Sequence, residues 1–240
     1  MTIRSAARAG AAVAAIAAAL AGCATPPDHF HTLRSAAPVP VPPSLSREQI
    51  LSIGPVTVPE SLQRDGWVLR TGSTGAQVHE HQLWTQGLGA EVAQSLADAL
   101  NRGPLPGALW ADAGPSGSGV GTDLDVAPAL RVRVQVVRFD GMFAPAPAIS
   151  DEVRWTIECL PADDALSPID AGRYREVRGG VRDVAGPAPE ADATVDDDQQ
   201  RYDRLARAHA DALRQVAGDI DHALRDSAAE RARICARAPR

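Results

Sequence analysis

The amino-acid sequence predicts a single α+β domain, with a mostly antiparallel sheet and two amphipathic helices packed on one face of that sheet. Three observations support this fold class. Apolar and polar residues alternate in several short segments, which is typical of half-buried strands. Two longer segments repeat apolar residues every three or four positions, which is typical of amphipathic helices. With 240 residues, of which 45% are hydrophobic, the chain is long enough for one domain with a substantial core.

The clearest strand pattern lies in residues 130–136, where apolar residues alternate with arginine and glutamine. Residues 153–159 alternate in the same way. The two segments are expected to pair as antiparallel strands across residues 140–150, where two prolines disfavour regular structure. Residues 174–181 form a weaker third strand of this group.

Further strands are expected in the first half of the chain. Residues 50–58 are partly alternating and end before a proline. Residues 67–70 and 77–83 are expected to form a hairpin across a turn that is rich in glycine and serine. The proline-rich residues 36–43 are expected to be extended and to lie outside the sheet.

Two segments have helical periodicity. Residues 87–101 carry an apolar residue at every fourth position from Leu88 to Leu100, and Gly103 follows as a termination signal. Residues 202–226 keep the same type of spacing. The glycine-rich residues 112–122 and the acidic residues 185–199 are expected to be loops.

The first residues have the pattern of a targeting segment. Arg4 and Arg8 precede an apolar run at residues 11–20, which is too short to span a membrane and matches a signal peptide. The run ends in Leu-Ala-Gly-Cys, a lipobox that resembles the signal for attachment of diacylglycerol to Cys23 and for cleavage before it. The alternative is an ordinary secretory signal in which this cysteine occurs by chance.

These signals divide the chain into a signal peptide, a tether with a proline-rich segment, one domain and a C-terminal tail, at residues 1–22, 23–45, 46–228 and 229–240. Loss of Arg4 and Arg8 takes the formal net charge from −6 to −8, with 22 arginines against 30 acidic residues. An acidic chain is a poor match for nucleic acid, whose binding depends on cationic neutralisation of phosphates. The balance also argues against a polybasic membrane patch.

Two cysteines remain after Cys23. In an oxidising compartment Cys159 and Cys235 can form a disulfide. The alternative is two separate thiols, with Cys159 buried as a small hydrophobic residue.

The sequence contains no clear catalytic or metal-binding set. His79 and His81 would share one face of a strand, but a third ligand at useful spacing is missing. His209 lies on the apolar stripe of the last helix, where a satisfied core histidine is expected. Residues 114–118 do not match the nucleophile elbow of hydrolases, and there is no phosphate-binding loop. We therefore expect no catalytic residues, no metal and no cofactor.

Several motifs occur in a familiar order. They are FHTL at residues 30–33, a strand ending in Val-Pro-x-x-Leu at residues 53–62, WVLR at 67–70, HQLW at 81–84, and a strand ending in Arg-Phe-Asp at 133–140 with Gly141 after it. Together they resemble the ABC-type transport auxiliary lipoproteins, a PqiC-like (YmbA-like) family of paraquat-inducible type. The resemblance extends over nearly the whole mature chain. Leu83, Gly87 and an insert at residues 111–123 depart from it.

The resemblance implies a non-catalytic component of an MCE/ABC-type intermembrane lipid transport system in the bacterial envelope. Its partners would be an MCE-domain protein, an ABC-type or paraquat-inducible-type membrane protein and the membrane itself. A homo-oligomer is compatible with this role. Nucleic acid is not expected as a partner. Ala24, where aspartate would favour inner-membrane retention, favours the periplasmic side of the outer membrane. The alternatives are a structural or assembly lipoprotein of the outer membrane and a periplasmic hydrolase.

For the surface that contacts a partner, the sequence suggests Trp67, Arg70 and Trp84. Exposed aromatic residues are enriched at interfaces. The alternative for each tryptophan is packing in the core, which the position of Trp84 at the start of an amphipathic helix favours.

Overall fold

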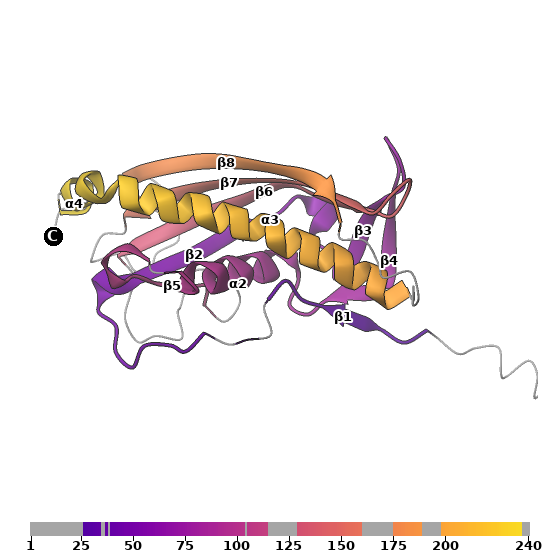
Figure 1. Cartoon of the computed structure of the whole chain (residues 1–240), viewed down its shortest axis with the longest axis horizontal. Coiled ribbons are helices and arrows are strands. Elements are labelled where there is room, and N and C mark those ends of the chain that lie inside the picture. The colour runs from indigo at the N-terminus through magenta and orange to yellow at the C-terminus, as the bar shows by residue number, and fades with distance from the viewer. Residues whose placement is uncertain are drawn as a thin grey trace, which may run out of the picture.

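A computed structural model describes residues 26–34, 37, 39–103, 105–114, 129–159, 175–188 and 198–236. Within these ranges the chain forms one mixed sheet, with helices covering one of its faces (Figure 1). The strands are β1 (His29–His31), β2 (Ile50–Thr57), β3 (Gly66–Arg70), β4 (Ala76–Trp84), β5 (Trp110–Asp112), β6 (Leu130–Met142), β7 (Ala148–Cys159) and β8 (Arg175–Pro187). The helices are α2 (Leu88–Asn101), α3 (Asp198–Asp226) and α4 (Ala228–Ala236), with short 3-10 turns at Arg47–Gln49, Glu60–Leu62 and Pro106–Ala108.

Strand β6 is the centre of the sheet. Along one edge it pairs antiparallel with β7, from Leu130 opposite Cys159 to Met142 opposite Ala148. Along its other edge it pairs in parallel with β2 in its first half and with β3 at its end. Strand β8 pairs antiparallel with β7, and β3 and β4 form an antiparallel hairpin. Short strands β1 and β5 pair in parallel with β4 and β2.

The α+β single-domain prediction is confirmed, and so is the antiparallel pairing of the two most clearly alternating segments. The sheet as a whole is mixed, however, because four of its pairings in the described residues are parallel. The reason is the connection between β2 and β6. The chain forms the β3–β4 hairpin and then α2, and this long crossover returns β6 in the direction of β2. An alternating pattern predicts a strand but not the direction of its neighbour.

Several element bounds differ from the expected ones. Strands β6 and β7 both extend into residues 140–150, so that only residues 143–147 connect them. Strand β8 runs to Pro187 and α3 begins at Asp198, so the expected loop at 185–199 is shorter at both ends. Helix α4 lies mostly within the C-terminal tail, for which the sequence pattern gave no structural prediction. Of the expected loop at 112–122, residues 115–122 lie outside the described residues.

The core lies between the sheet and helices α2 and α3. The four-residue repeat of α2 is buried, as its periodicity predicts, and the apolar stripe of α3 is buried in the same way. From the sheet, the inward-facing residues of β6 and β7 complete this core. They are Val132, Val134, Val136, Val153, Trp155 and Ile157.

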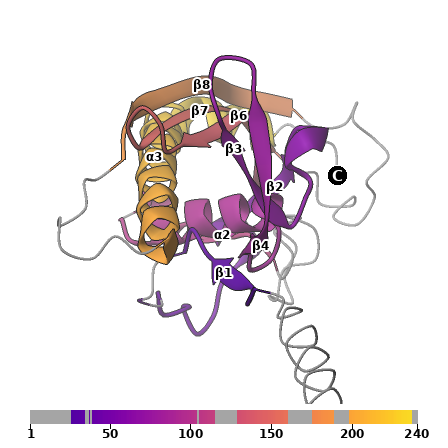
Figure 2. The same cartoon turned by 90° about the vertical axis from the view of Figure 1, so that its right-hand side faces the viewer.

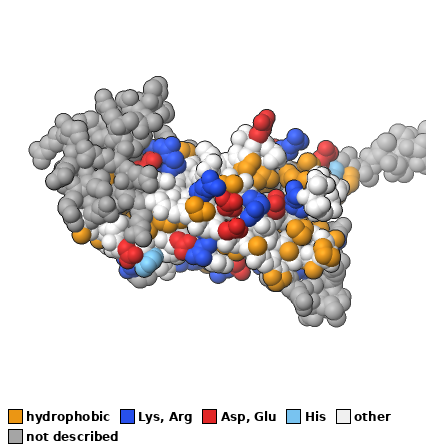
Figure 3. All heavy atoms as spheres, turned by 90° about the horizontal axis from the view of Figure 1, so that it is seen from above, with side chains coloured by type: hydrophobic (Ala, Val, Ile, Leu, Met, Phe, Trp, Pro, Cys, Tyr) orange, Lys and Arg blue, Asp and Glu red, His pale blue; other side chains and the backbone are white. Residues whose placement is uncertain are grey.

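The molecule is elongated, with β1 and the start of α3 near one end and α4 at the other (Figure 1). Figure 2 looks along this axis and shows α2 and α3 as separate helices on the same side of strands β6, β7 and β8. Seen from above, acidic and basic side chains are interspersed, which is typical of a solvated surface (Figure 3). Among the described helices none carries an apolar stretch of membrane-spanning length.

Candidate functional site

Strand β1 lies within residues 23–45, the segment expected to be a tether, and is fixed to the rest of the sheet and to α3. The His31 side chain is buried and bridges two elements, with Nδ1 3.2 Å from Oδ1 of Asp203 on α3 and Nε2 2.6 Å from Oε1 of Gln82 on β4. The neighbouring Phe30 points away and is 62% exposed. The alternation of an exposed and a buried residue is that of an edge strand with one face on the core.

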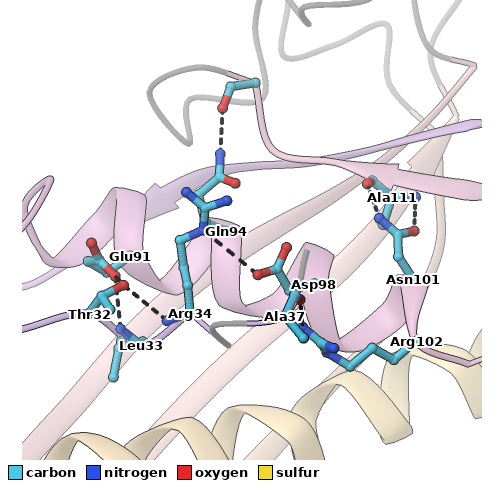
Figure 4. Close-up of polar contacts among 11 residues, drawn as sticks. Thr32, Leu33, Arg34, Ala37, Glu91, Gln94, Asp98, Asn101, Arg102 and Ala111 are labelled. Atoms are coloured by element: carbon cyan, nitrogen blue, oxygen red, sulfur yellow. Dashed lines mark hydrogen bonds and ion pairs between the residues drawn. The ribbon is translucent and has the colours of Figure 1, made fainter. Parts of the chain in front are cut away.

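A buried carboxylate holds the next two residues. Glu91, in the first turn of α2, is 1% exposed, and its Oε2 accepts hydrogen bonds from Thr32 Oγ1 at 2.7 Å and from the Leu33 backbone N–H at 2.9 Å (Figure 4). A carboxylate in this turn is also favoured by the partial positive charge of the helix N-terminus. Residues 31–33 are therefore held by hydrogen bonds to β4, α2 and α3.

The two tryptophans suggested for a partner surface both lie in the core, which was the favoured alternative for Trp84. Trp67 is 2% and Trp84 is 7% exposed, and their rings stack with centroids 4.3 Å apart. Tyr202 of α3 packs edge-on against Trp67. In this arrangement neither indole is accessible to a partner, because α3 covers the end of the hairpin where both lie. Arg70 is half-buried, and its Nη2 donates to the backbone oxygen of Ser73 within the hairpin turn.

The two histidines of β4 have separate partners. His79 Nδ1 lies 2.6 Å from the Tyr202 hydroxyl, and His81 Nδ1 lies 2.9 Å from Oδ1 of Asp28. Among the described residues no three His, Cys, Asp or Glu side chains are grouped as metal ligands. The two rings therefore attach the tether and α3 to β4.

A buried ion pair connects α3 with the sheet. His209 Nδ1 lies 2.8 and 3.0 Å from the two carboxylate oxygens of Asp151 on β7, and both side chains are 2% exposed. Burial raises the pKa of Asp151, although the adjacent His209 opposes this shift. The expectation of a satisfied core histidine is confirmed. Asp151 was missed, yet its position could have revealed it, since it occupies an inward-facing place among the apolar residues of its strand.

A groove of about 370 Å³ lies between α2 and α3, beside the chain that leaves β1. Its charged lining consists of four arginines and two aspartates, namely Arg34, Arg102, Arg207, Arg214, Asp98 and Asp211. Its apolar lining includes Leu33, Ala99 and Ala210. The sequence pattern gives no sign of this groove, because the arginines come from three distant segments.

The charged side chains of the groove are only partly paired. Arg34 Nε lies 3.7 Å from Asp98 Oδ2, and Arg102 Nη2 donates to the Ala37 backbone oxygen at 2.9 Å (Figure 4). Burial raises the pKa of Asp98, although both arginines lower it. On α3, Arg207 Nε donates to the backbone oxygen of Asp203. Arg214 pairs with Asp211.

At the opposite end of the molecule a disulfide joins β7 to α4. Cys159 at the end of β7 and Cys235 on α4 form a disulfide in the structure, with Cα atoms 5.5 Å apart. This separation is within the range that a disulfide requires. Cys23, the expected lipidation site, lies outside the described residues.

Comparison with known proteins agrees with the fold. Two crystal structures, one of an uncharacterised protein and one of protein XCC0632 from Xanthomonas campestris, a DUF330 protein, each superpose with a TM-score of 0.53 at 15% identity. The matches cover 82% and 85% of this chain and 98% and 99% of the other chains. At this identity they show a common fold. No curated protein matches the sequence.

The class of the protein follows from a family model. The model of the ABC-type transport auxiliary lipoprotein component matches residues 31–221, from the buried histidine of β1 to the last turns of α3. The chain belongs to this family. The matched span contains the last residue of β1, the aromatic core of the hairpin, the groove and the Asp151–His209 pair.

Proposed function

We propose that this protein is a non-catalytic component of a lipid transport system of the bacterial envelope. In this proposal it is anchored through Cys23 and acts with an MCE-domain protein and an ABC-type or paraquat-inducible-type membrane protein. The observation that carries the proposal is the family match over residues 31–221, whose description names a lipoprotein and an auxiliary component of ABC-type transport. The proposed location is the periplasmic face of the outer membrane.

The physical argument concerns the cost of moving lipid through water. Each methylene exposed to water costs about 0.8 kcal/mol, so a lipid crossing the periplasm needs a protein path that reaches the membrane. Only five residues lie between Cys23 and His29, the first residue of β1, so the two are six positions apart. Since an extended residue spans at most about 3.5 Å, β1 would lie within roughly 20 Å of the lipidated cysteine. Because hydrogen bonds to β4, α2 and α3 hold residues 31–33, the whole domain would then stay close to the membrane surface.

The test is a pull-down of the lipid-anchored protein from solubilised envelope membranes after their separation by density. We expect the protein in the outer-membrane fraction and recovery of an MCE-domain protein with it. Cys23→Ser should lose membrane retention, because the lipid is then not attached. Cys235→Ser removes a cysteine outside the lipobox and should remain membrane-bound.

Deletion of the gene should increase sensitivity of the envelope to detergent or solvent. Normal membrane retention of Cys23→Ser would contradict the anchor. Recovery of partners from an unrelated assembly, with no envelope phenotype, would favour the alternative of a structural or assembly lipoprotein. Turnover of an ester substrate by the purified protein would revive the hydrolase alternative.

A further inference from the structure

The groove between α2 and α3 collects positive charge in an acidic protein. Its lining contains four arginines against two aspartates, whereas the whole chain has a formal net charge of −6. The arginines come from three places in the sequence: Arg34 follows β1, Arg102 caps the C-terminus of α2, and Arg207 and Arg214 lie on α3. Seven residues make about two helical turns, so the last two lie on the same face of α3.

The guanidinium groups retain hydrogen-bonding capacity. Each has five N–H donors. In the described part of the chain, Arg102 uses one of its nitrogens on Ala37 and Arg207 uses only Nε, on Asp203. The Arg34 ion pair with Asp98 is long, at 3.7 Å, and the Arg34 side chain is 44% exposed. Several donors therefore remain for a ligand in the groove.

We infer that this groove binds a phosphate group carried by a small amphiphilic or soluble ligand. Guanidinium groups recognise phosphate through paired N–H donors, which makes arginine better suited to this role than a point charge. A volume of about 370 Å³ is sufficient for a phosphate with its attached glycerol or sugar. The apolar lining by Leu33, Ala99 and Ala210 suits the less polar part of such a ligand.

Two sources provide this chemistry, an anionic phospholipid headgroup and a free phosphate ester. The headgroup would come from the membrane next to β1, and this source alone rests on the proposed anchoring. Phosphate binding as such rests only on the geometry and charge of the groove. Failure of the anchor would therefore leave the phosphate inference standing, and the two can fail separately.

The experiment uses the mature protein as isolated from cells, in a neutral detergent, and measures binding by titration calorimetry. The probes are short-chain phosphatidylglycerol, short-chain phosphatidylcholine and inorganic phosphate. We expect saturable binding that weakens with added salt. Tighter binding of phosphatidylglycerol than of the other two would identify a headgroup, and equal binding of inorganic phosphate would identify a free phosphate ester.

The variants Arg34→Gln and Arg207→Gln remove two of the four cations while keeping side-chain length. Each should weaken binding on the order of tenfold, as expected for the loss of a charged hydrogen bond. Arg225→Gln is the matched control, because Arg225 lies on the same helix but pairs with Asp221 outside the groove. Circular dichroism and thermal melting check that each variant is folded. Absence of saturable binding, or equal affinities in the groove variants and in the control, would overturn the inference.

Discussion

Gly180 on β8 illustrates how single residues shape this sheet. It lies directly opposite Trp155 of β7, whose indole occupies the space that a side chain at position 180 would need. A Cβ atom there would lie 2.5 Å from Cζ2 and 2.8 Å from Cε2 of the tryptophan. Glycine at this position therefore lets a large buried aromatic residue extend across its neighbouring strand.

We predict that Gly180→Ala destabilises the protein by about 1–3 kcal/mol, because the added methyl group forces the buried Trp155 ring to move. The free energy of unfolding from urea titration measures this effect. Gly186→Ala, on the same strand, is the control, since a Cβ at that position meets no atom within 4 Å. Equal stability of the two variants would show that the ring adjusts without cost.

At the scale of elements, helix α3 is fixed to the sheet by polar groups as well as by its apolar stripe. His209 pairs with Asp151 on β7, and Arg182 on β8 forms a two-pronged ion pair with Asp219. The first pair is buried and the second is half-exposed. Removing one partner of the buried pair is expected to lower the free energy of unfolding more than removing one partner of the half-exposed pair. The remaining buried group would keep its charge with neither an ion-pair partner nor water to stabilise it.

The raised pKa of Asp151 predicts a pH dependence. The folded state holds the proton of the Asp151 carboxyl more tightly than the unfolded state does. The contribution of this protonated carboxyl to the free energy of unfolding is therefore complete below about pH 4 and is lost as the pH rises through the folded-state pKa. Asp151→Asn cannot ionise but keeps an acceptor for His209. The stability of the wild type relative to this variant should therefore decrease as the pH rises through that window, as measured by urea unfolding.

Asp140 and Arg138 also act on the Asp151 carboxyl, so the buffer series is run at constant ionic strength. Asp221→Asn removes one partly exposed carboxylate of α3 that pairs with Arg225 and controls for the change in net charge. A wild-type stability that rises relative to Asp151→Asn through the same pH range would contradict the assigned direction.

At the scale of the whole molecule, the two ends of the chain are secured differently. The tether end is held by hydrogen bonds from β4, α2 and α3 to residues 31–33. The opposite end is held by the disulfide that joins the last residue of β7 to α4. The disulfide spans 76 residues of sequence, including β8 and the whole of α3.

We predict that breaking this link by Cys159→Ser and Cys235→Ser together costs up to roughly 4.5 kcal/mol, since the unfolded chain gains the freedom of the closed loop. A thiol assay on the unfolded, unreduced wild type should detect neither cysteine. The single variant Cys235→Ser keeps the buried Cys159 and separates the effect of cross-linking from that of packing. Detection of both thiols in the wild type would refute the pairing.

Much of the fold could be predicted from local pattern. The alternation in residues 130–136 and 153–159 predicted the antiparallel β6–β7 pair, and the four-residue repeat from Leu88 to Leu100 predicted α2. These predictions succeeded because burial of one face imposes a period on the sequence. The mixed character of the sheet was missed because parallel neighbours are brought together by a long crossover, and no local period records its path.

The candidate site was predicted less well, for a related reason. Trp67 and Trp84 were suggested for a partner surface, although the position of Trp84 already favoured the core, and the packing of α3 over the hairpin buries both. The arginine groove needs residues 34, 102, 207 and 214 to lie close together, which depends on how α2 and α3 pack against each other on the sheet.

The sequence by itself therefore determined the elements, the α+β class and the family resemblance, because these depend on order and periodicity along the chain. Tertiary structure alone decided which strands run in parallel, which aromatic residues are accessible and where charge accumulates. Those properties arise from contacts between segments that are distant in sequence. The pairs Asp151–His209 and Glu91–Leu33, each 58 residues apart, exist only once the sheet and both helices are in place.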